Sequence, residues 1–141
     1  MSAPAHSLAL DLCIPSDLAE ARRVQGEIEQ ALQQSQFCEH DIFAIKLAIE
    51  EALVNAIKHG NGMDRTKCVR VSCRVAAERF EVHIADEGPG FDPDHVPDPT
   101  APENLERPCG RGLLLMRHYM TEVAYHDCGR AVRMAKVRRH G

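Results

Sequence analysis

Aromatic residues are scarce in this chain: among 141 residues there are no Trp, two Tyr and four Phe. Modules that stack nucleic-acid bases, and clefts that bind sugars on aromatic rings, depend on such side chains. An excess of positive charge is also lacking, since 17 Lys and Arg stand against 21 Asp and Glu, for a net charge of -4. A non-specific DNA-binding protein usually leans basic. We therefore expect no direct contact with nucleic acid.

Long apolar runs are missing as well. The first apolar stretch, Leu8 to Leu12, is interrupted by Asp11. No stretch approaches the roughly 18 residues that a membrane-spanning helix needs. The first residues lack the basic segment of a secretory signal. These absences predict a cytoplasmic protein with no membrane segment, whose thiols stay reduced.

The usual metal-binding spacings are not present either. The chain has six cysteines but no C-x-x-C pair, and eight histidines but no H-E-x-x-H pattern. Cys68 and Cys73 lie five positions apart in an expected strand, so they should point to opposite faces. We expect the cysteines to be buried, unreactive thiols, with a metal or redox role as the alternative.

What the chain does have is enough apolar material for a core, because hydrophobic residues make up 44% of it. No linker divides it, which predicts one domain over residues 1–141. Five prolines between residues 92 and 108 predict an irregular lid at about 92–109. Asp17 and Glu20 predict a helix cap. Periodicity predicts helices at 17–35, 40–58 and 112–120, and strands at 8–12, 67–75, 79–85, 122–126 and 131–137.

The second predicted helix carries Glu51 and Asn55. At a spacing of four residues they lie about 40° apart around the helix axis and point the same way. Glu50 lies about 140° from Asn55 and cannot share that face. A carboxylate beside a carboxamide can hold a hard cation such as Mg²⁺ and polarise a hydroxyl. The alternative is a solvated helix face.

A second motif follows the strand expected at 79–85. The strand ends in Asp86, and Gly88 and Gly90 come directly afterwards. Glycine permits backbone angles and close approaches that are closed to other residues. An Asp at a strand end beside such a loop can accept a hydrogen bond from the amino group of a heterocycle. The alternative is an ordinary hairpin turn, in which Asp and Gly are common.

The third motif is Gly110-Arg111-Gly112, which opens the helix expected at 112–120. Free backbone N–H groups and the positive end of a helix dipole favour a phosphate there. The motif is not a Rossmann fingerprint, since no strand precedes it, and the chain contains no Gly-Lys-Ser/Thr of a P-loop. The alternative is a simple glycine cap.

Taken in order, the three motifs resemble those of the GHKL superfamily of ATP-binding domains, and most closely the bacterial anti-sigma-factor serine/threonine kinases. The N-box is matched from Glu51 to Gly60, the G1 box from Asp86 to Phe91, and the G2 box from Gly110 to Leu113. The resemblance implies an α+β two-layer sandwich, in which helices cover one face of a mixed, mostly antiparallel sheet.

The resemblance also implies roles. Glu51 would be the general base, Asn55 the Mg²⁺ ligand, and Asp86 the acceptor for the adenine amino group. Arg107 resembles the catalytic lid arginine of the kinases, with Arg111 as the runner-up, although the interval from Arg107 to Gly110 is one residue longer than usual. The glycines that would shape the pocket or meet the phosphates are Gly88, Gly90, Gly110 and Gly112.

The function that the resemblance implies is a Mg²⁺- and ATP-dependent protein serine/threonine kinase. It would phosphorylate a small anti-sigma-antagonist-like protein, sequester a sigma factor or another regulatory protein, and form a homodimer. One alternative is a nucleotide-dependent protein-binding switch that transfers no phosphate. A weaker alternative is an ATP hydrolase.

Overall fold

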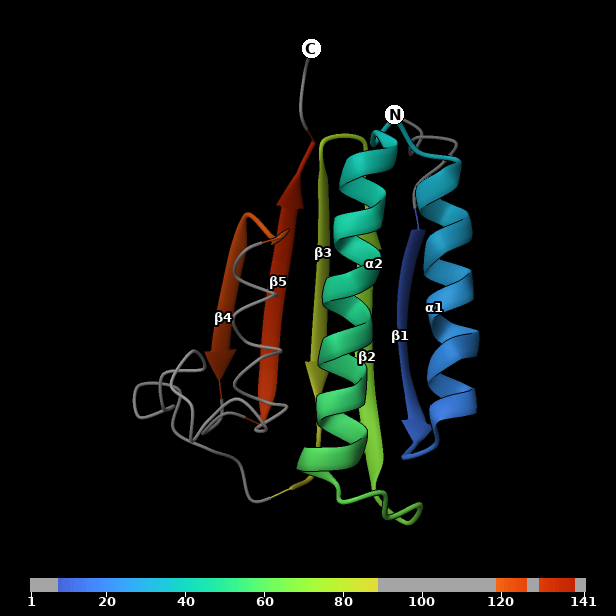
Figure 1. The fold of residues 1–141 in the computed structure, drawn as a ribbon, viewed down its shortest axis with the longest axis vertical. Coiled ribbons are helices and arrows are strands. Elements are labelled where there is room, and N and C mark those ends of the chain that lie inside the picture. The colour runs from blue at the N-terminus through green and yellow to red at the C-terminus, as the bar shows by residue number, and fades with distance from the viewer. Residues whose placement is uncertain (1–7, 89–118, 127–129, 139–141) are drawn as a thin grey trace, which may run out of the picture.

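The computed structural model describes residues 8–88, 119–126 and 130–138 (Figure 1). The strands at 79–85, 122–126 and 131–137 match the predicted ranges residue for residue. In chain order the elements are β1 (Leu8–Pro15), α1 (Leu18–Gln33), α2 (Glu39–Val54), η1 (Asn55–Gly60), β2 (Cys68–Val75), β3 (Arg79–Ala85), β4 (Glu122–His126) and β5 (Ala131–Val137).

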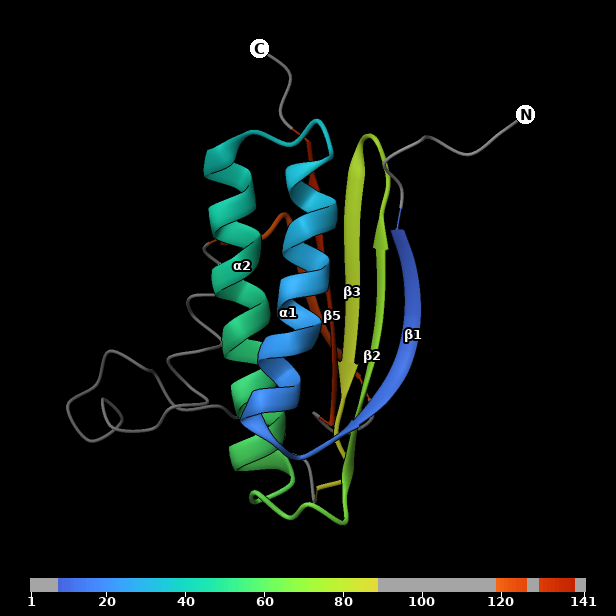
Figure 2. The ribbon, with the colours of Figure 1, turned by 90° about the vertical axis from the view of Figure 1, so that its right-hand side faces the viewer.

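The five strands form one sheet in the order β1-β2-β3-β5-β4. All four pairings between them are antiparallel. Helices α1 and α2 lie side by side over one face of this sheet, so the described part of the chain has two layers (Figure 2). The predicted fold class, an α+β sandwich with helices on one face, is confirmed.

Strand β1 is longer than predicted, because it pairs with β2 along its whole length, from Leu8 opposite Val75 to Pro15 opposite Cys68. Pro15 is the last residue of the strand, whereas the prediction ended the strand before it. A proline is tolerated at that position because β1 is an edge strand.

Helix α1 begins where the sequence predicts. The side chain of Asp17 accepts a hydrogen bond from the backbone N–H of Ala19 at 2.8 Å. Glu20 does not complete a reciprocal cap, since it pairs instead with Arg23 on the next turn. One stripe of apolar residues, spaced three and four positions apart, faces the sheet and is buried: Ala21, Val24, Ile28 and Leu32.

The core lies between the helices and the covered face of the sheet. Its largest fully buried side chains are Phe80, Ile28, Leu32, Ile45, Ile49, Leu53, Ile57, Ile84, Met134, Val69 and Val71. Alternation in β2 and β3 places every second residue in this layer, as the period of a half-buried strand requires. The core holds α2 against β3 and thereby fixes the positions of the motif residues.

The cysteine prediction is correct only in part. Cys73 is buried, and burial raises the pKa of its thiol to about 12, which makes it unreactive. Cys68 is half-buried on the opposite face of β2, as predicted. Cys13 and Cys38 are exposed, so the expectation of burial is wrong for both. Exposure of Cys13 follows from its place on the uncovered face of an edge strand.

The lid at 92–109 and most of the helix expected at 112–120 lie outside the described residues. No helix in the described ranges is long and apolar enough to cross a membrane. Within the same ranges, no cluster of three His, Cys, Asp or Glu side chains could hold a metal ion by itself.

Candidate functional site

Glu51 lies in the last turn of α2 and Asn55 directly follows it as the first residue of η1, in the relation that the sequence predicts. The helix is regular up to Val54, and the backbone N–H of Asn55 donates to the carbonyl oxygens of Glu51 and Ala52. Both side chains are half-buried. Glu50 instead lines a groove between α1 and α2, which places it away from Asn55.

The carbonyl oxygen of the Asn55 side chain is the notable atom of this helix. Asn55 Oδ1 is buried, yet it accepts no hydrogen bond from any described residue. Leaving such an acceptor buried and unsatisfied costs about 1–3 kcal/mol. An acceptor of this kind is suited to a ligand that brings its own donor or positive charge.

The sequence predicts that the α-helix continues to residue 58, but in the structure α2 ends at Val54. Residues Asn55–Gly60 form the π-helical turn η1, which closes with a hydrogen bond of 2.8 Å from the Asn61 N–H to the Ala56 carbonyl five residues earlier. Such wide turns occur frequently at functional sites. Here the turn places Gly60 beside the end of β3.

Gly60 lies in close contact with the G1 segment, against the side chain of Asp86 and the backbone of Gly88. A Cβ atom on Gly60 would overlap the carboxylate of Asp86, and one on Gly88 would overlap the carbonyl group of Gly60. Among the described glycines only Gly62 has a positive φ, 61°. Gly88 is therefore required for close approach and not for an unusual backbone angle.

Asp86 is half-buried at the end of β3. Its Oδ1 accepts a hydrogen bond of 2.8 Å from the N–H of Gly88. Burial raises the pKa of the carboxyl group, although that hydrogen bond and the positive charges of Arg130 and Lys67 oppose the rise. The second oxygen, Oδ2, has no hydrogen bond to the described residues and can accept one from a ligand.

The segment around Asp86 is held from two sides. Arg130, just before β5, accepts the N–H of Asp86 through its carbonyl at 2.8 Å and donates through Nε to the carbonyl of Gly88. Asn61, just after η1, accepts the N–H of Glu87 through Oδ1 at 2.8 Å. The ends of β1, η1 and β3 and the starts of β2 and β5 all lie at this end of the molecule, the lower end in Figure 1.

Sequence reasoning identified Glu51, Asn55, Asp86 and Gly88, and the structure brings the G1 residues against the end of the helix that carries the other two. It included Gly60 only as the last residue of the N-box match, and it assigned no role to Asn61 or Arg130. The other predicted site residues, Gly90, Arg107, Gly110, Arg111 and Gly112, lie outside the described residues.

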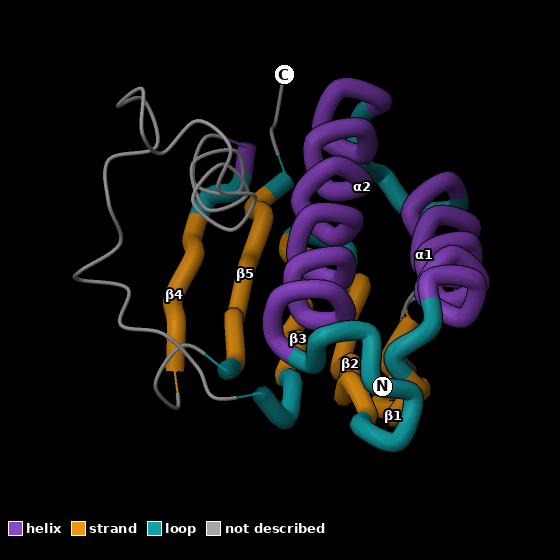
Figure 3. The backbone as a smooth tube through the Cα atoms, turned by 60° about the horizontal axis from the view of Figure 1, so that its bottom comes forward, coloured by secondary structure: helices purple, strands orange, loops and turns teal. Residues whose placement is uncertain are grey.

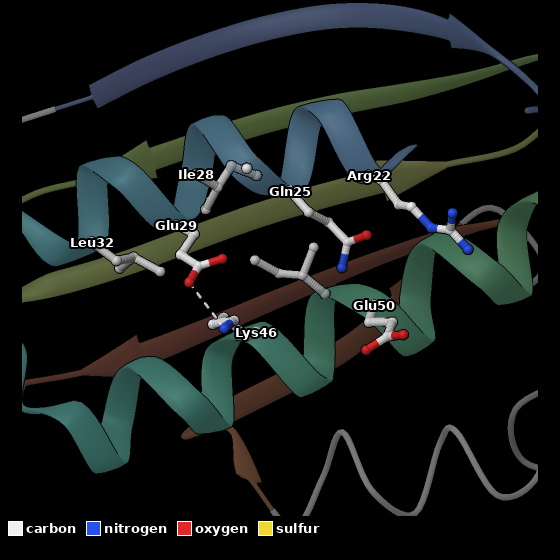
Figure 4. A pocket seen from close by; sticks show the side chains of 9 residues that line it. Arg22, Gln25, Ile28, Glu29, Leu32, Lys46 and Glu50 are labelled. Carbon is white, nitrogen blue, oxygen red and sulfur yellow. Dashed lines mark ion pairs between the residues drawn. The ribbon is translucent and has the colours of Figure 1, made fainter. Parts of the chain in front are cut away.

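A groove of about 220 Å³ lies elsewhere, between α1 and α2 (Figure 4). An ion pair of 3.0 Å between Glu29 Oε1 and Lys46 Nζ crosses it. Arg22 and Glu50 also line it, so its charges are mixed. None of the predicted site residues contributes to this groove, which is therefore separate from the motif end.

Comparison with known proteins gives the family directly. The model of the histidine kinase-like ATPase domain matches residues 14–136, most of the chain. The chain belongs to this family. The predicted resemblance to GHKL ATP-binding domains is thereby confirmed.

Similar proteins carry kinase names. The chain is 32% identical over 85 residues to the serine/threonine-protein kinase BtrW of Bordetella bronchiseptica, covering 59% of this chain and 60% of that protein. It is 34% identical over 105 residues to the serine-protein kinase RsbW of Bacillus subtilis, covering 68% of this chain and 64% of that one. The chain thus spans less than two thirds of these relatives.

A crystal structure of RsbU and RsbW domains from Mycobacterium tuberculosis has the same fold. The TM-score is 0.62, and the match covers 94% of this chain and 32% of that one. Sequence identity is 16%, so the likeness extends to the fold alone.

Proposed function

We propose that this protein binds Mg²⁺-ATP and is a protein serine/threonine kinase. The observation that carries the proposal is the buried Oδ1 of Asn55, which has no partner in the described residues and lies one helical turn from Glu51. The same helix ends against Asp86, whose second oxygen is also available. Membership of the histidine kinase-like ATPase family and the kinase names of the relatives support it.

The residues fit the two groups that the family implies. A carboxylate at Asp86 accepts a hydrogen bond from the exocyclic amino group of adenine, whereas guanine presents a carbonyl oxygen at that position. The amide oxygen of Asn55 is a hard ligand of the kind that Mg²⁺ prefers, and one or two protein ligands are the usual number for this ion beside phosphates. Asn55 would therefore hold the metal and Asp86 the base.

Bound Mg²⁺-ATP supplies the phosphoryl group and the positive charge that offsets the phosphates. Glu51 would orient the hydroxyl group of the partner's serine or threonine and accept its proton. Its half-buried carboxylate has no ion pair or hydrogen bond with the described residues, so both oxygens are available for this task. Roles for Arg107, Arg111 and the glycines at 90, 110 and 112 stay predictions.

The substrate in this proposal is another protein. We infer a small anti-sigma-antagonist-like protein as the acceptor, and sequestration of a sigma factor or another regulatory protein as the second task. The kinase names of the relatives support a protein acceptor. A net charge of -4 also favours a protein over nucleic acid. A cytoplasmic location and a homodimer belong to the same proposal.

Transfer of label from γ-labelled ATP tests this function. The wild type, Glu51→Gln and the matched control Glu50→Gln are incubated with Mg²⁺ and candidate partner proteins. We expect the partner to gain label with the wild type and with Glu50→Gln, and label to fall at least about 100-fold with Glu51→Gln. ATP binding without any labelled partner would contradict the kinase and favour the nucleotide-dependent binding switch. Failure of the wild type to bind ATP would contradict both the kinase and the binding switch.

A further inference from the structure

Asn61 is a buried amide at the motif end, with 3% of its surface exposed. Its Nδ2 donates to Ser16 Oγ at 2.9 Å and to the Cys68 carbonyl at 3.1 Å. Its Oδ1 accepts the Glu87 N–H at 2.8 Å. Both donors and one of the two acceptor positions of the side chain are used, which is close to the maximum for an asparagine.

These bonds join four segments, two of which are 45 and 26 residues away from Asn61 in the sequence. Asn61 itself follows η1, Ser16 lies in the turn between β1 and α1, Cys68 begins β2, and Glu87 follows β3. Ser16 is buried as well and donates onward to the Lys67 carbonyl at 2.7 Å. Figure 3 brings this end forward and shows the loops after α2 and β3 gathered beside the turn that follows β1.

The bond to Glu87 is one of the bonds that hold the backbone around Asp86 in place, and it is the one that ties this backbone to the end of η1. Glu87 N belongs to the peptide unit that directly follows Asp86, and the carbonyl of Arg130 holds the peptide N–H that directly precedes it. Among the described residues, the Asp86 carboxylate itself bonds only to the N–H of Gly88, two residues on in the same segment. That local bond moves with the segment and cannot fix it relative to the helix.

We propose that Asn61 is a positioning residue for base selection: by holding the Glu87 N–H, it keeps the Asp86 carboxylate where adenine is accepted and guanine rejected. The inference rests on the proposed function, because it requires a purine nucleotide in the site. Selectivity of this kind depends on placement, since a polar group that is displaced from its partner loses both the attraction to the correct base and the repulsion of the wrong one.

A purely structural role for Asn61 gives a different result. Loss of buried hydrogen bonds would lower the stability of the fold and weaken the binding of all nucleotides alike. A positioning role changes the ratio of the GTP and ATP dissociation constants. That ratio is the readout that separates the two.

The experiment compares Asn61→Ala with the matched control Ser16→Ala. The control removes the hydroxyl that bonds to Asn61 Nδ2 and to the Lys67 carbonyl, but it keeps the bond from Glu87 to Asn61. Dissociation constants for ATP and GTP are measured by calorimetry. We expect the GTP/ATP ratio to fall at least about tenfold in Asn61→Ala and to stay within about twofold of the wild type in Ser16→Ala, although both variants melt at lower temperature.

The outcomes are distinct. An unchanged ratio in Asn61→Ala, with the wild type preferring ATP, overturns this inference and leaves the proposed function intact. Failure of the wild type to bind ATP overturns the proposed function. Should Asn61→Ala not fold, Asn61→Ser is measured by the same criterion, and failure of both to fold would show that Asn61 is structural and overturn the inference.

Discussion

The two ends of the sheet treat buried polar groups in opposite ways. At the end that holds the start of β3, Lys136 is only 7% exposed, and its ammonium group donates to the Tyr119 carbonyl and lies 3.9 Å from Asp41 Oδ1. At the other end, Asn55 Oδ1 is buried with no partner in the described residues. At the first end the buried carboxylate of Asp41 faces the opposite charge of Lys136, whereas the buried Oδ1 of Asn55 faces no donor among the described residues, which is the arrangement expected for the proposed ligand site.

The largest effect should come from breaking the framework end. Lys136→Met removes the ammonium group that faces the buried Asp41, which should lower the free energy of unfolding by about 3–5 kcal/mol in urea denaturation. The double variant Lys136→Met/Asp41→Leu should recover much of that loss, because it removes both charges. A loss below about 1 kcal/mol in the single variant would show that this pair does not hold the framework.

A smaller loss of stability, with a complete loss of binding, is expected at the site end. Gly60→Ala places a methyl group on the Asp86 carboxylate, so unfolding should become easier by about 1–3 kcal/mol and ATP binding should disappear. Gly26→Ala is the control, since its Cβ meets nothing within 4 Å, and it should stabilise α1 by about 0.5–1 kcal/mol. ATP binding by Gly60→Ala at wild-type affinity would disprove the contact.

Asp86→Asn separates binding from stability. Burial raises the pKa of Asp86 in the fold, so the folded state holds its proton more tightly than the unfolded chain. The wild type therefore loses stability as pH rises from about 4 through the raised pKa, and the variant lacks this loss.

We expect Asp86→Asn to melt at or above the wild-type temperature at pH 7, with the advantage shrinking toward pH 4, while ATP affinity falls at least about tenfold. Melting curves across this pH range, together with calorimetry, check both parts. A variant that is less stable than the wild type at pH 7 would contradict the view that burial of the charge is costly there.

The smallest effect should come from the uncovered face of the sheet. Arg70 donates twice to the exposed carboxylate of Asp11, at 3.1 and 2.8 Å, and with Ser72 it lowers the pKa of that group. Any stability from this pair is present above pH 4 and lost as pH falls below it, and salt screens it. Asp11→Asn should barely change a thermal melt at high salt; a loss like that of Lys136→Met would refute the contrast between exposed and buried pairs.

The sequence predicts the sheet well because local pattern decides it. Phe80, Val82 and Ile84 alternate with polar residues, and β3 follows that pattern with no error at either end. The π-helical turn was not predictable, since Ala56 and Ile57 are buried in either kind of helix. At the end of this turn Gly60 packs against Asp86, and the periodicity of one segment cannot reveal a contact with another segment.

The residues of the candidate site also fall into two groups, those that the sequence predicts and those that only the structure reveals. The order of the three motifs points to Glu51, Asn55 and Asp86, whose local context is specific. Asn61 and Arg130 act through backbone groups 26 and 42 residues away, and a lone Asn or Arg in a loop carries no signal of such a bond. Supporting residues of this kind emerge only when the segments are placed in space.

The side chain of Asn61 joins partners 45 and 26 residues distant in the chain. Closing such loops is entropically costly until the strands they connect have already paired. The bonds of Asn61 at the motif end can therefore form only after β1, β2, β3 and the end of α2 have come together. A chain that folds in this order cannot form a complete nucleotide pocket while its sheet is only partly formed. It therefore gains the ability to bind at the same step at which folding is completed.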